Sequence, residues 1–219
     1  MDNLAQVCTD LESAGVKFQK SLKPGSSKDD FAIALDPNGY WIEILSYPGA
    51  HATTVGSSKD TFLFNWTSIR VKNPKESLNF YRSVLGMSLL HTQEFPSRKF
   101  TLYFLGYRRP NAKHQEGVMS ILGREGVLEL TWNHGTESDP DFKGYHNGNA
   151  EPQGFGHTCI TVDDLDEACK RFEELNVNWK KRLTDGRMKN VAFVLDPDGY
   201  WVEYVTSYLP EFMCLGCLC

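Results

Sequence analysis

The chain has 219 residues, of which 41% are hydrophobic and 23% charged, a composition typical of a globular protein with one or two domains. Its formal net charge of −5 and the lack of a basic stripe interleaved with aromatic residues exclude a nucleic-acid-binding class. No apolar run approaches the length of a membrane span, and residues 1–3 begin the chain without a signal-peptide core. We therefore expect a cytoplasmic protein without membrane contacts that acts on a small molecule.

The first segment has the pattern of one helix followed by three strands. Apolar residues recur at helical spacing from Leu4 to Ala14, and Gly15 follows as a helix stop. Extended segments are predicted at residues 16–22, 31–35 and 40–45. Residues 48–60 are small, polar and unpatterned, which is typical of a linker or a connecting loop.

A second unit begins with an extended stretch at residues 65–72 and continues into a helix. Asn73 suits the N-cap of that helix and Pro74 its first position, while Gly86 predicts its end. Strands are then predicted at residues 87–95, 99–107 and 126–132.

The same order of elements returns from Gly156 onward. The predicted elements are a strand to residue 162, a helix at 163–175 and strands near Lys180, at 191–195 and at 200–205. We therefore predict two complete units of strand, helix and three strands, and at the front one unit that lacks its first strand. The predicted domains are the last part of a truncated first domain (1–47), a linker (48–61), a complete domain of two units (62–208) and a cysteine-rich tail (209–219).

The tail carries Cys214, Cys217 and Cys219. Their spacing resembles a prenylation signal or a metal knuckle. Because no histidine accompanies them, we interpret the segment as a frayed terminus whose role stays open.

One motif occurs twice with a carboxylate inside an apolar, aromatic strand. Residues 36–43 read DPNGYWIE, and residues 196–203 read DPDGYWVE. The Asp-Pro-Asp-Gly part predicts a turn, because proline fixes one turn dihedral and glycine accepts a positive φ. An unpaired buried carboxylate is costly, so the glutamate of the motif, Glu203 in the second copy, indicates a metal site or a proton transfer.

Two further strands carry a residue that could bind a metal. The alternation of strand side chains places Glu129 on the opposite face from Leu128 and Leu130, and His157 opens the strand before residue 162. A lone strand histidine is often a hydrogen-bonded core residue, and a strand glutamate often faces water. If the sheets curl around a shared cavity, Glu129, His157 and Glu203 would instead form a nitrogen and oxygen donor set suited to zinc or another divalent transition metal.

Several ordered motifs resemble the glyoxalase I family of lactoylglutathione lyases. The motifs are RVKNP (70–74), SLNFY (77–81), VLGM (84–87), LELT (128–131), YHNGN (145–149), GFGH (154–157) and DPDGYWVE (196–203). The resemblance covers residues 65–205 and implies an α+β, vicinal-oxygen-chelate fold of paired βαβββ modules. Residues 1–46 resemble the last part of a preceding copy, as in the fused two-domain glyoxalases of fungi.

The resemblance also implies a reaction and its residues. The expected reaction is the metal-dependent isomerisation of the methylglyoxal–glutathione hemithioacetal to S-lactoylglutathione through an enediolate. Glu203 would shuttle the proton and bind the metal, with His157 and Glu129 as further ligands. The long loops resemble zinc-using rather than nickel-preferring relatives, so one zinc ion per site is expected, with nickel as the alternative. The residues expected to hold glutathione are Arg70, Asn133, Lys181 and Arg187.

Three departures from the family pattern bear on activity. A ligand position that holds Gln or His in relatives falls on Trp66, whose indole cannot bind a metal, and a basic position falls on Gln153. The front copy brings Glu43 without a counterpart of His157. Because each family site joins modules of two domains, we expect a homodimer in which Glu129 of one chain faces His157 and Glu203 of the other, with activity that depends on protein concentration.

Two other functions remain as alternatives. Trp66 and the missing front favour a catalytically impaired, truncated homologue that still binds metal or glutathione conjugates. A ring-cleaving dioxygenase of the same superfamily would need two histidines and one carboxylate around iron, and His157 is the one suitable histidine in the sequence.

Overall fold

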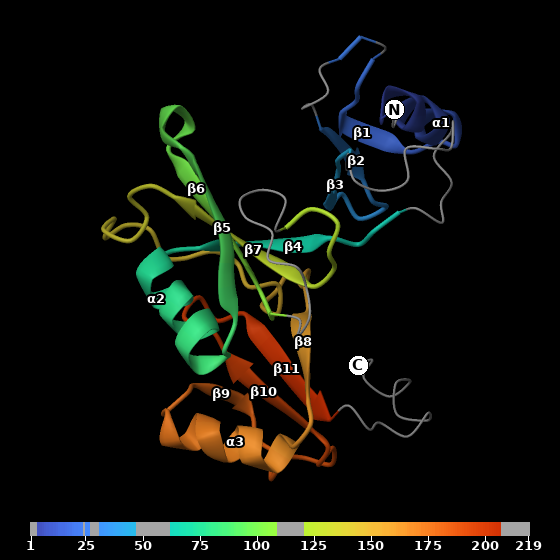
Figure 1. Ribbon diagram of the computed structural model, residues 1–219. Helices are drawn as coiled ribbons and strands as arrows, with labels where there is room; N and C mark the ends of the chain where they lie inside the picture. Colours follow the sequence, from blue (N-terminus) through green and yellow to red (C-terminus); the bar gives the residue numbers. More distant parts are fainter. Residues whose placement is uncertain (1–3, 24, 27–30, 47–61, 109–120, 207–219) are drawn as a thin grey trace. The chain divides into compact units, whose positions relative to one another are not determined.

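The computed structural model describes residues 4–23, 25–26, 31–46, 62–108 and 121–206 (Figure 1). The predicted linker at 48–61 and the cysteine-rich tail at 209–219 lie outside this range. Contacts divide the chain into two compact units, which we call the front unit (Met1–Asn65 and Val118–Gly126) and the main unit (Trp66–Gly117 and Val127–Cys219). The predicted domain boundaries stay a prediction. Among the helices that the structure describes, none combines the length and apolar character that crossing a membrane requires.

The front unit contains one helix and a three-stranded antiparallel sheet. Its elements are α1 (Leu4–Ser13), β1 (Lys17–Lys20), β2 (Ala32–Leu35) and β3 (Trp41–Ile44), with sheet order β1-β2-β3. The buried side chains of Cys8, Leu22 and Ala32 form its core. Gly15, two residues after the end of the helix, has a φ of +86°, a left-handed conformation that favours glycine and is common where helices end.

The first module of the main unit follows the predicted order. Its elements are β4 (Trp66–Val71), α2 (Pro74–Asn79), the π-helical turn η2 (Phe80–Val84), β5 (Ser88–Phe95), the 3₁₀ turn η3 (Pro96–Arg98), β6 (Phe100–Gly106) and β7 (Val127–Asn133). The sheet order is β4-β7-β6-β5, and β4 runs parallel to β7. The predicted cap is confirmed, because Asn73 Oδ1 accepts a hydrogen bond from Lys75 N at 3.1 Å and Pro74 is the first helical residue.

The second module repeats this arrangement. Its elements are β8 (His157–Val162), α3 (Leu165–Glu174), β9 (Trp179–Lys181), β10 (Val191–Leu195) and β11 (Trp201–Thr206). The sheet order is β8-β11-β10-β9, and β8 runs parallel to β11. The predicted α+β fold of paired βαβββ modules is confirmed.

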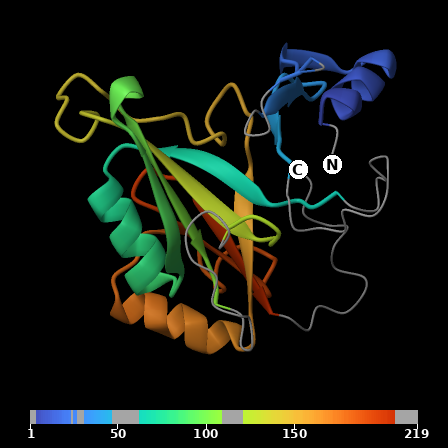
Figure 2. The same ribbon diagram turned by 45° about the horizontal axis from the view of Figure 1, so that its top comes forward.

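The two sheets of the main unit share one hydrophobic core. Leu128 and Leu130 of β7 belong to the same buried cluster as Val202 and Tyr204 of β11 and Phe172 of α3. The helices α2 and α3 lie beside one another in both views (Figures 1 and 2). We call the sheet faces turned toward this core the inner faces and the opposite ones the outer faces. Because side chains alternate along a strand, the residues between these apolar positions point to the outer faces.

The second copy of the repeated motif joins the two modules through Asp196. Its Oδ1 accepts the backbone N–H groups of Asp198 at 3.0 Å and Tyr200 at 2.8 Å, which closes the turn. Its Oδ2 accepts the Tyr81 hydroxyl of η2 at 2.8 Å. Asp196 is 2% exposed, and burial raises its pKa to about 7 although these three donors oppose the shift.

We predict that Asp196→Asn removes a pH dependence of stability. The unfolded carboxyl has a pKa of about 3.9, and the folded one about 7, so the folded chain binds this proton more tightly. The stabilisation is therefore complete below about pH 4 and is lost as the pH rises through about 7. Urea unfolding at a series of pH values should show wild-type stability falling, relative to the variant, by up to about 1.4 kcal/mol per pH unit in this interval.

Asp36→Asn is the matched control for this measurement. Asp36 accepts the backbone N–H groups of Asn38 and Tyr40, both at 2.8 Å, in the equivalent turn of the front unit. We expect this variant to keep the wild-type pH profile. A difference between Asp196→Asn and wild type that does not change with pH would contradict the prediction.

Candidate functional site

His157 and Glu203 form a close pair on the outer face of the second sheet. His157 begins β8 and Glu203 lies within β11, and the parallel register pairs Trp201 with His157 and Glu203 with Cys159. The two side chains therefore share one face, where His157 Nε2 lies 3.1 Å from Glu203 Oε2. Glu203 is 8% exposed. An imidazole nitrogen and a carboxylate oxygen at this distance are held together by a proton or by a cation between them.

Aromatic side chains surround this pair. The ring of Phe193 meets the His157 ring edge-on with a centroid distance of 5.3 Å, and it lies 5.8 Å from the Trp201 ring. Phe193 belongs to a small buried cluster with Val191 and Val205. Phe193 and Trp201 thus place apolar surface beside the two polar groups, a combination that is typical of binding sites.

Glu129 occupies the corresponding outer face of the first sheet. It lies in β7 opposite Ser68 of β4 and Phe104 of β6. Its Oε1 accepts the Ser68 hydroxyl at 2.6 Å and the Thr131 hydroxyl at 3.2 Å. Glu129 is 6% exposed, and burial raises its pKa although both hydroxyls and the charge of Arg70 favour the ionised form.

Trp66 lies on the same outer face as Glu129. It begins β4 two residues before Ser68, and its ring packs edge-on against Phe104 with a centroid distance of 5.5 Å. The indole thus fills this position with an aromatic contact, and its one polar group is an N–H donor. The expected lack of a ligand at Trp66 follows from its chemistry alone.

A single chain brings together only part of the predicted metal set. His157 and Glu203 are adjacent, whereas Glu129 lies on the outer face of the other sheet. Within the described ranges, no three His, Cys, Asp or Glu side chains are grouped closely enough to hold a metal ion. The nitrogen and oxygen donors of the pair suit a divalent transition metal, but a stable zinc site needs three or four ligands. Glu129 and the His157–Glu203 pair are therefore two separate groups of candidate donors, which we call the half-sites.

The residues predicted to hold glutathione have different settings. Arg70 is exposed on β4 on the same face as Glu129, and Arg187 is exposed between β9 and β10. Asn133 ends β7, and its Nδ2 donates to the Tyr145 hydroxyl oxygen at 2.7 Å. These assignments stay predictions; the charge of Arg70 acts on Glu129.

Lys181 has a structural role in addition to any binding role. Its Nζ donates to the backbone carbonyl oxygens of Arg182, Met188 and Val191 at 3.2, 2.6 and 2.8 Å. Burial lowers its pKa. These three bonds occupy all three donors of the ammonium group, so a bound carboxylate would have to replace one of the carbonyl groups.

Sequence reasoning did not identify Ser68, the shortest hydrogen-bond partner of Glu129. The alternation along β7 places Thr131 on the face of Glu129, but Ser68 is 61 residues away in the chain. The parallel pairing of β4 with β7 could have indicated it, because the first and last strands of each predicted module are neighbours.

The sequence is similar to known proteins of one superfamily. Residues 63–204 match the family described as the Glyoxalase/Bleomycin resistance protein/Dioxygenase superfamily. A Saccharomyces cerevisiae protein named Glyoxalase I is 49% identical over 212 residues, which are 94% of this chain and 61% of that protein. A Pseudomonas aeruginosa protein named Lactoylglutathione lyase is 53% identical over 152 residues, covering 68% of this chain and 84% of the relative.

Solved structures extend this likeness to three dimensions. The crystal structure of glyoxalase I from Zea mays superposes with a TM-score of 0.64 at 25% identity, covering 94% of this chain and 64% of that one. This chain spans less than two thirds of both the yeast protein and the maize structure.

We predict that Glu129→Met raises the free energy of unfolding of metal-stripped protein by about 1 kcal/mol, because the variant removes a buried carboxylate. Ser68 and Thr131 would keep each other as partners, since their hydroxyl oxygens are 3.3 Å apart. Urea unfolding near neutral pH measures the change. Glu94→Met, at an exposed position of β5, is the control and should change stability by less than about 0.5 kcal/mol. Destabilisation by Glu129→Met would instead assign the carboxylate a structural role.

Proposed function

Because this chain belongs to the Glyoxalase/Bleomycin resistance protein/Dioxygenase superfamily, and within it to the lactoylglutathione lyases, we propose that it is a metal-dependent lyase. Its substrate would be the hemithioacetal of methylglyoxal and glutathione, and its product S-lactoylglutathione. The observation that carries the proposal is the 3.1 Å contact of His157 Nε2 with Glu203 Oε2 on neighbouring parallel strands. Fold and sequence relationship support it.

Glu203 is the proposed proton carrier. Its carboxylate would take the proton from the carbon that bears sulfur and hydroxyl, and would return it to the neighbouring carbonyl carbon. The hydroxyl proton of the first carbon passes to the oxygen of the second, so the first carbon becomes the thioester carbonyl and the second carries the new hydroxyl group. Atoms and electrons then balance without an oxidant. The apolar setting of Glu203 beside Phe193 and Trp201 supports this role, because excluding water keeps the proton from exchanging.

The proposed metal ligands are His157 and Glu203 of one chain together with Glu129 of a second chain. A bound divalent cation would supply positive charge next to the substrate oxygens, which lowers the cost of the negative charge that develops on them. We propose zinc, because one imidazole and two carboxylates suit this borderline ion, with nickel as the alternative.

The arrangement of the half-sites supports a homodimer. Glu129 and the His157–Glu203 pair occupy outer faces, which the shared core turns away from each other within a chain. A two-fold axis would bring Glu129 of each chain to the pair of the other and so create two equal sites. Activity would then require association of two chains.

Arg70 is the proposed principal contact for glutathione. It is exposed, and its charge already acts on Glu129, so it could hold a substrate carboxylate beside the reacting group. Asn133, Lys181 and Arg187 would supply secondary contacts. We also propose a cytoplasmic location, because a glutathione adduct forms where the reduced thiol is maintained.

A second candidate function is a catalytically impaired homologue that binds metal or glutathione conjugates. Trp66 favours it, because an aromatic contact with Phe104 replaces a possible fourth ligand. The two candidates differ in turnover, which the following experiments measure.

We predict that Glu203→Gln lowers turnover by at least about 10²-fold, because the amide cannot carry the proton. Thioester formation from methylglyoxal and glutathione is followed by ultraviolet absorbance with protein that has been metal-stripped and reconstituted with zinc or nickel. Glu174→Gln, at an exposed position that ends α3, is the control and should retain wild-type activity. Absence of turnover with either metal, combined with binding of S-methylglutathione, would favour the impaired homologue.

We predict that two inactive variants restore activity to one another. Glu129→Gln and Glu203→Gln damage different half-sites, so a mixed dimer contains one intact and one doubly altered site. Equal amounts, mixed under conditions that exchange subunits, should recover about a quarter of wild-type activity, because half of the dimers are mixed. Wild-type activity that persists in a confirmed monomer, or no recovery after proven exchange, would contradict the shared site.

A further inference from the structure

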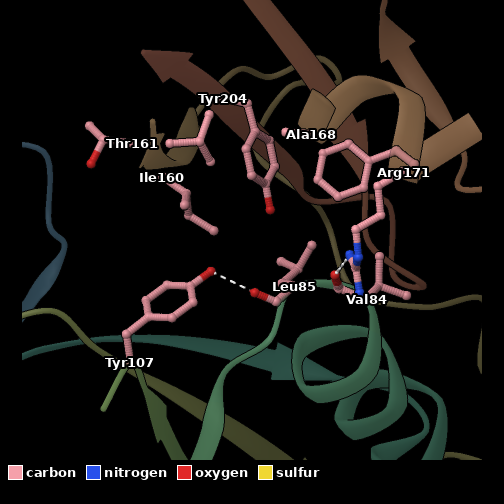
Figure 3. A pocket seen from close by; sticks show the side chains of 10 residues that line it. Val84, Leu85, Tyr107, Ile160, Thr161, Ala168, Arg171 and Tyr204 are labelled. Carbon is pink, nitrogen blue, oxygen red and sulfur yellow. Dashed lines mark hydrogen bonds between the residues drawn. The ribbon is translucent and has the colours of Figure 1, made fainter. Parts of the chain in front are cut away.

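A pocket of about 280 Å³ lies within the main unit, on the inner side of the second sheet (Figure 3). Its walls come from the end of η2, from Tyr107 just after β6, and from β8, α3 and β11. Its apolar lining includes Leu85, Ile160, Val162, Ala168 and Phe172. The pocket is separate from the candidate metal half-sites, which occupy the outer faces.

One buried polar group in the pocket lacks a partner. Tyr204 is 2% exposed, and its hydroxyl is buried without a hydrogen bond to any residue that the structure describes. Figure 3 shows this hydroxyl pointing into the pocket between Ile160 and Leu85. Leaving such a group unpaired costs about 1–3 kcal/mol, and each buried unpaired group in a folded protein calls for a physical reason. Burial raises the pKa of Tyr204, so its phenol keeps a proton to donate.

Two other polar side chains of the pocket, Tyr107 and Arg171, already have hydrogen-bond partners. The Tyr107 hydroxyl donates to the Leu85 carbonyl oxygen at 2.8 Å. Arg171 donates to the Ser83 carbonyl oxygen at 2.9 Å and to the Val84 carbonyl oxygen, which closes the end of η2. Arg171 is the one charged side chain among the described residues that line the pocket, and its positive charge acts on both tyrosine hydroxyls.

We propose that this pocket binds a small monocarboxylate with a compact aromatic or branched body, whose carboxylate accepts the Tyr204 hydroxyl beside Arg171. A hydroxyl donor and a cation at one end of an apolar pocket match an anionic oxygen joined to an apolar group. A cavity of about 150 Å³ accepts benzene, so about 280 Å³ accommodates a ring with a short acid side chain. Phenylacetate has these properties.

Phenylacetate is therefore the probe, titrated into ¹⁵N-labelled protein and followed by NMR of the backbone amides. We expect saturable shifts at residues 84–86, 160–162 and 168–172. Tyr204→Phe should weaken the affinity about 10-fold, the equivalent of one hydrogen bond to a charged group. Tyr103→Phe is the matched control, because Tyr103 lies on β6 away from the pocket lining, and it should bind as wild type does. Phenylacetamide, which is neutral, should bind more weakly than phenylacetate.

Three further measurements do not depend on the affinity of Tyr204→Phe for phenylacetate. Because its hydroxyl lacks a partner, Tyr204→Phe should leave the unliganded protein as stable as wild type or more stable. Ile160→Trp should fill the pocket and abolish the shifts. Saturating glutathione should not alter phenylacetate binding, since glutathione would occupy the outer faces.

Three results would overturn the proposal. Shifts confined to the outer face around Arg70 or His157 would mean that phenylacetate binds the substrate cations instead. Equal affinity in wild type and Tyr204→Phe would remove the hydroxyl from recognition. No pocket shifts up to about 20 mM phenylacetate, an affinity weaker than about −2.3 kcal/mol, would mean that the pocket holds only water.

Discussion

The shared core of the two modules fixes where every functional group of the main unit points. Leu128 and Leu130 in β7, and Val202 and Tyr204 in β11, are committed to this core. Strand geometry then sends the glutamate between each pair to the opposite face. A shift of one residue in either strand would bury that carboxylate in the core and expose the apolar side chains, so the core defines the register. Packing on the inner faces of the sheets therefore decides which residues lie in the half-sites on the outer faces.

This constraint explains why the described residues of one chain include metal donors but do not bring three of them together. The two sheets turn their inner faces to one core, so their outer faces cannot meet in the same copy of the main unit. The buried carboxylate of Glu129 accepts hydrogen bonds from two hydroxyl groups, and burial raises its pKa. Such a group is costly for stability alone. In the proposed dimer, a second chain would complete the site around Glu129, so the buried carboxylate would have a function and activity would depend on association.

Features that depend on residues close together in the sequence were predicted. Contacts that depend on how distant strands pair were not. Asn73 and Pro74 predict the start of α2. The alternation of side chains along residues 127–132 predicts that Glu129 points away from the core. The Ser68–Glu129 hydrogen bond depends on a parallel pairing across 61 residues. The three carbonyl partners of Lys181 meet only when the chain between β9 and β10 folds back. Likewise, the pocket at Tyr204 needs walls from both modules, and no local pattern encodes it.

The two copies of the repeated motif show that a carboxylate in an aromatic strand does not by itself make a site. Glu203 is buried because β11 lies between β8 and β10, and β8 supplies His157. Glu43 has the equivalent place in β3, which is an edge strand of the three described in the front unit, and Trp41 there is 62% exposed. The same side chains thus gain a binding environment only when a neighbouring strand covers them and brings a nitrogen donor. The pairing of β11 with β8, rather than the motif itself, makes Glu203 a candidate ligand.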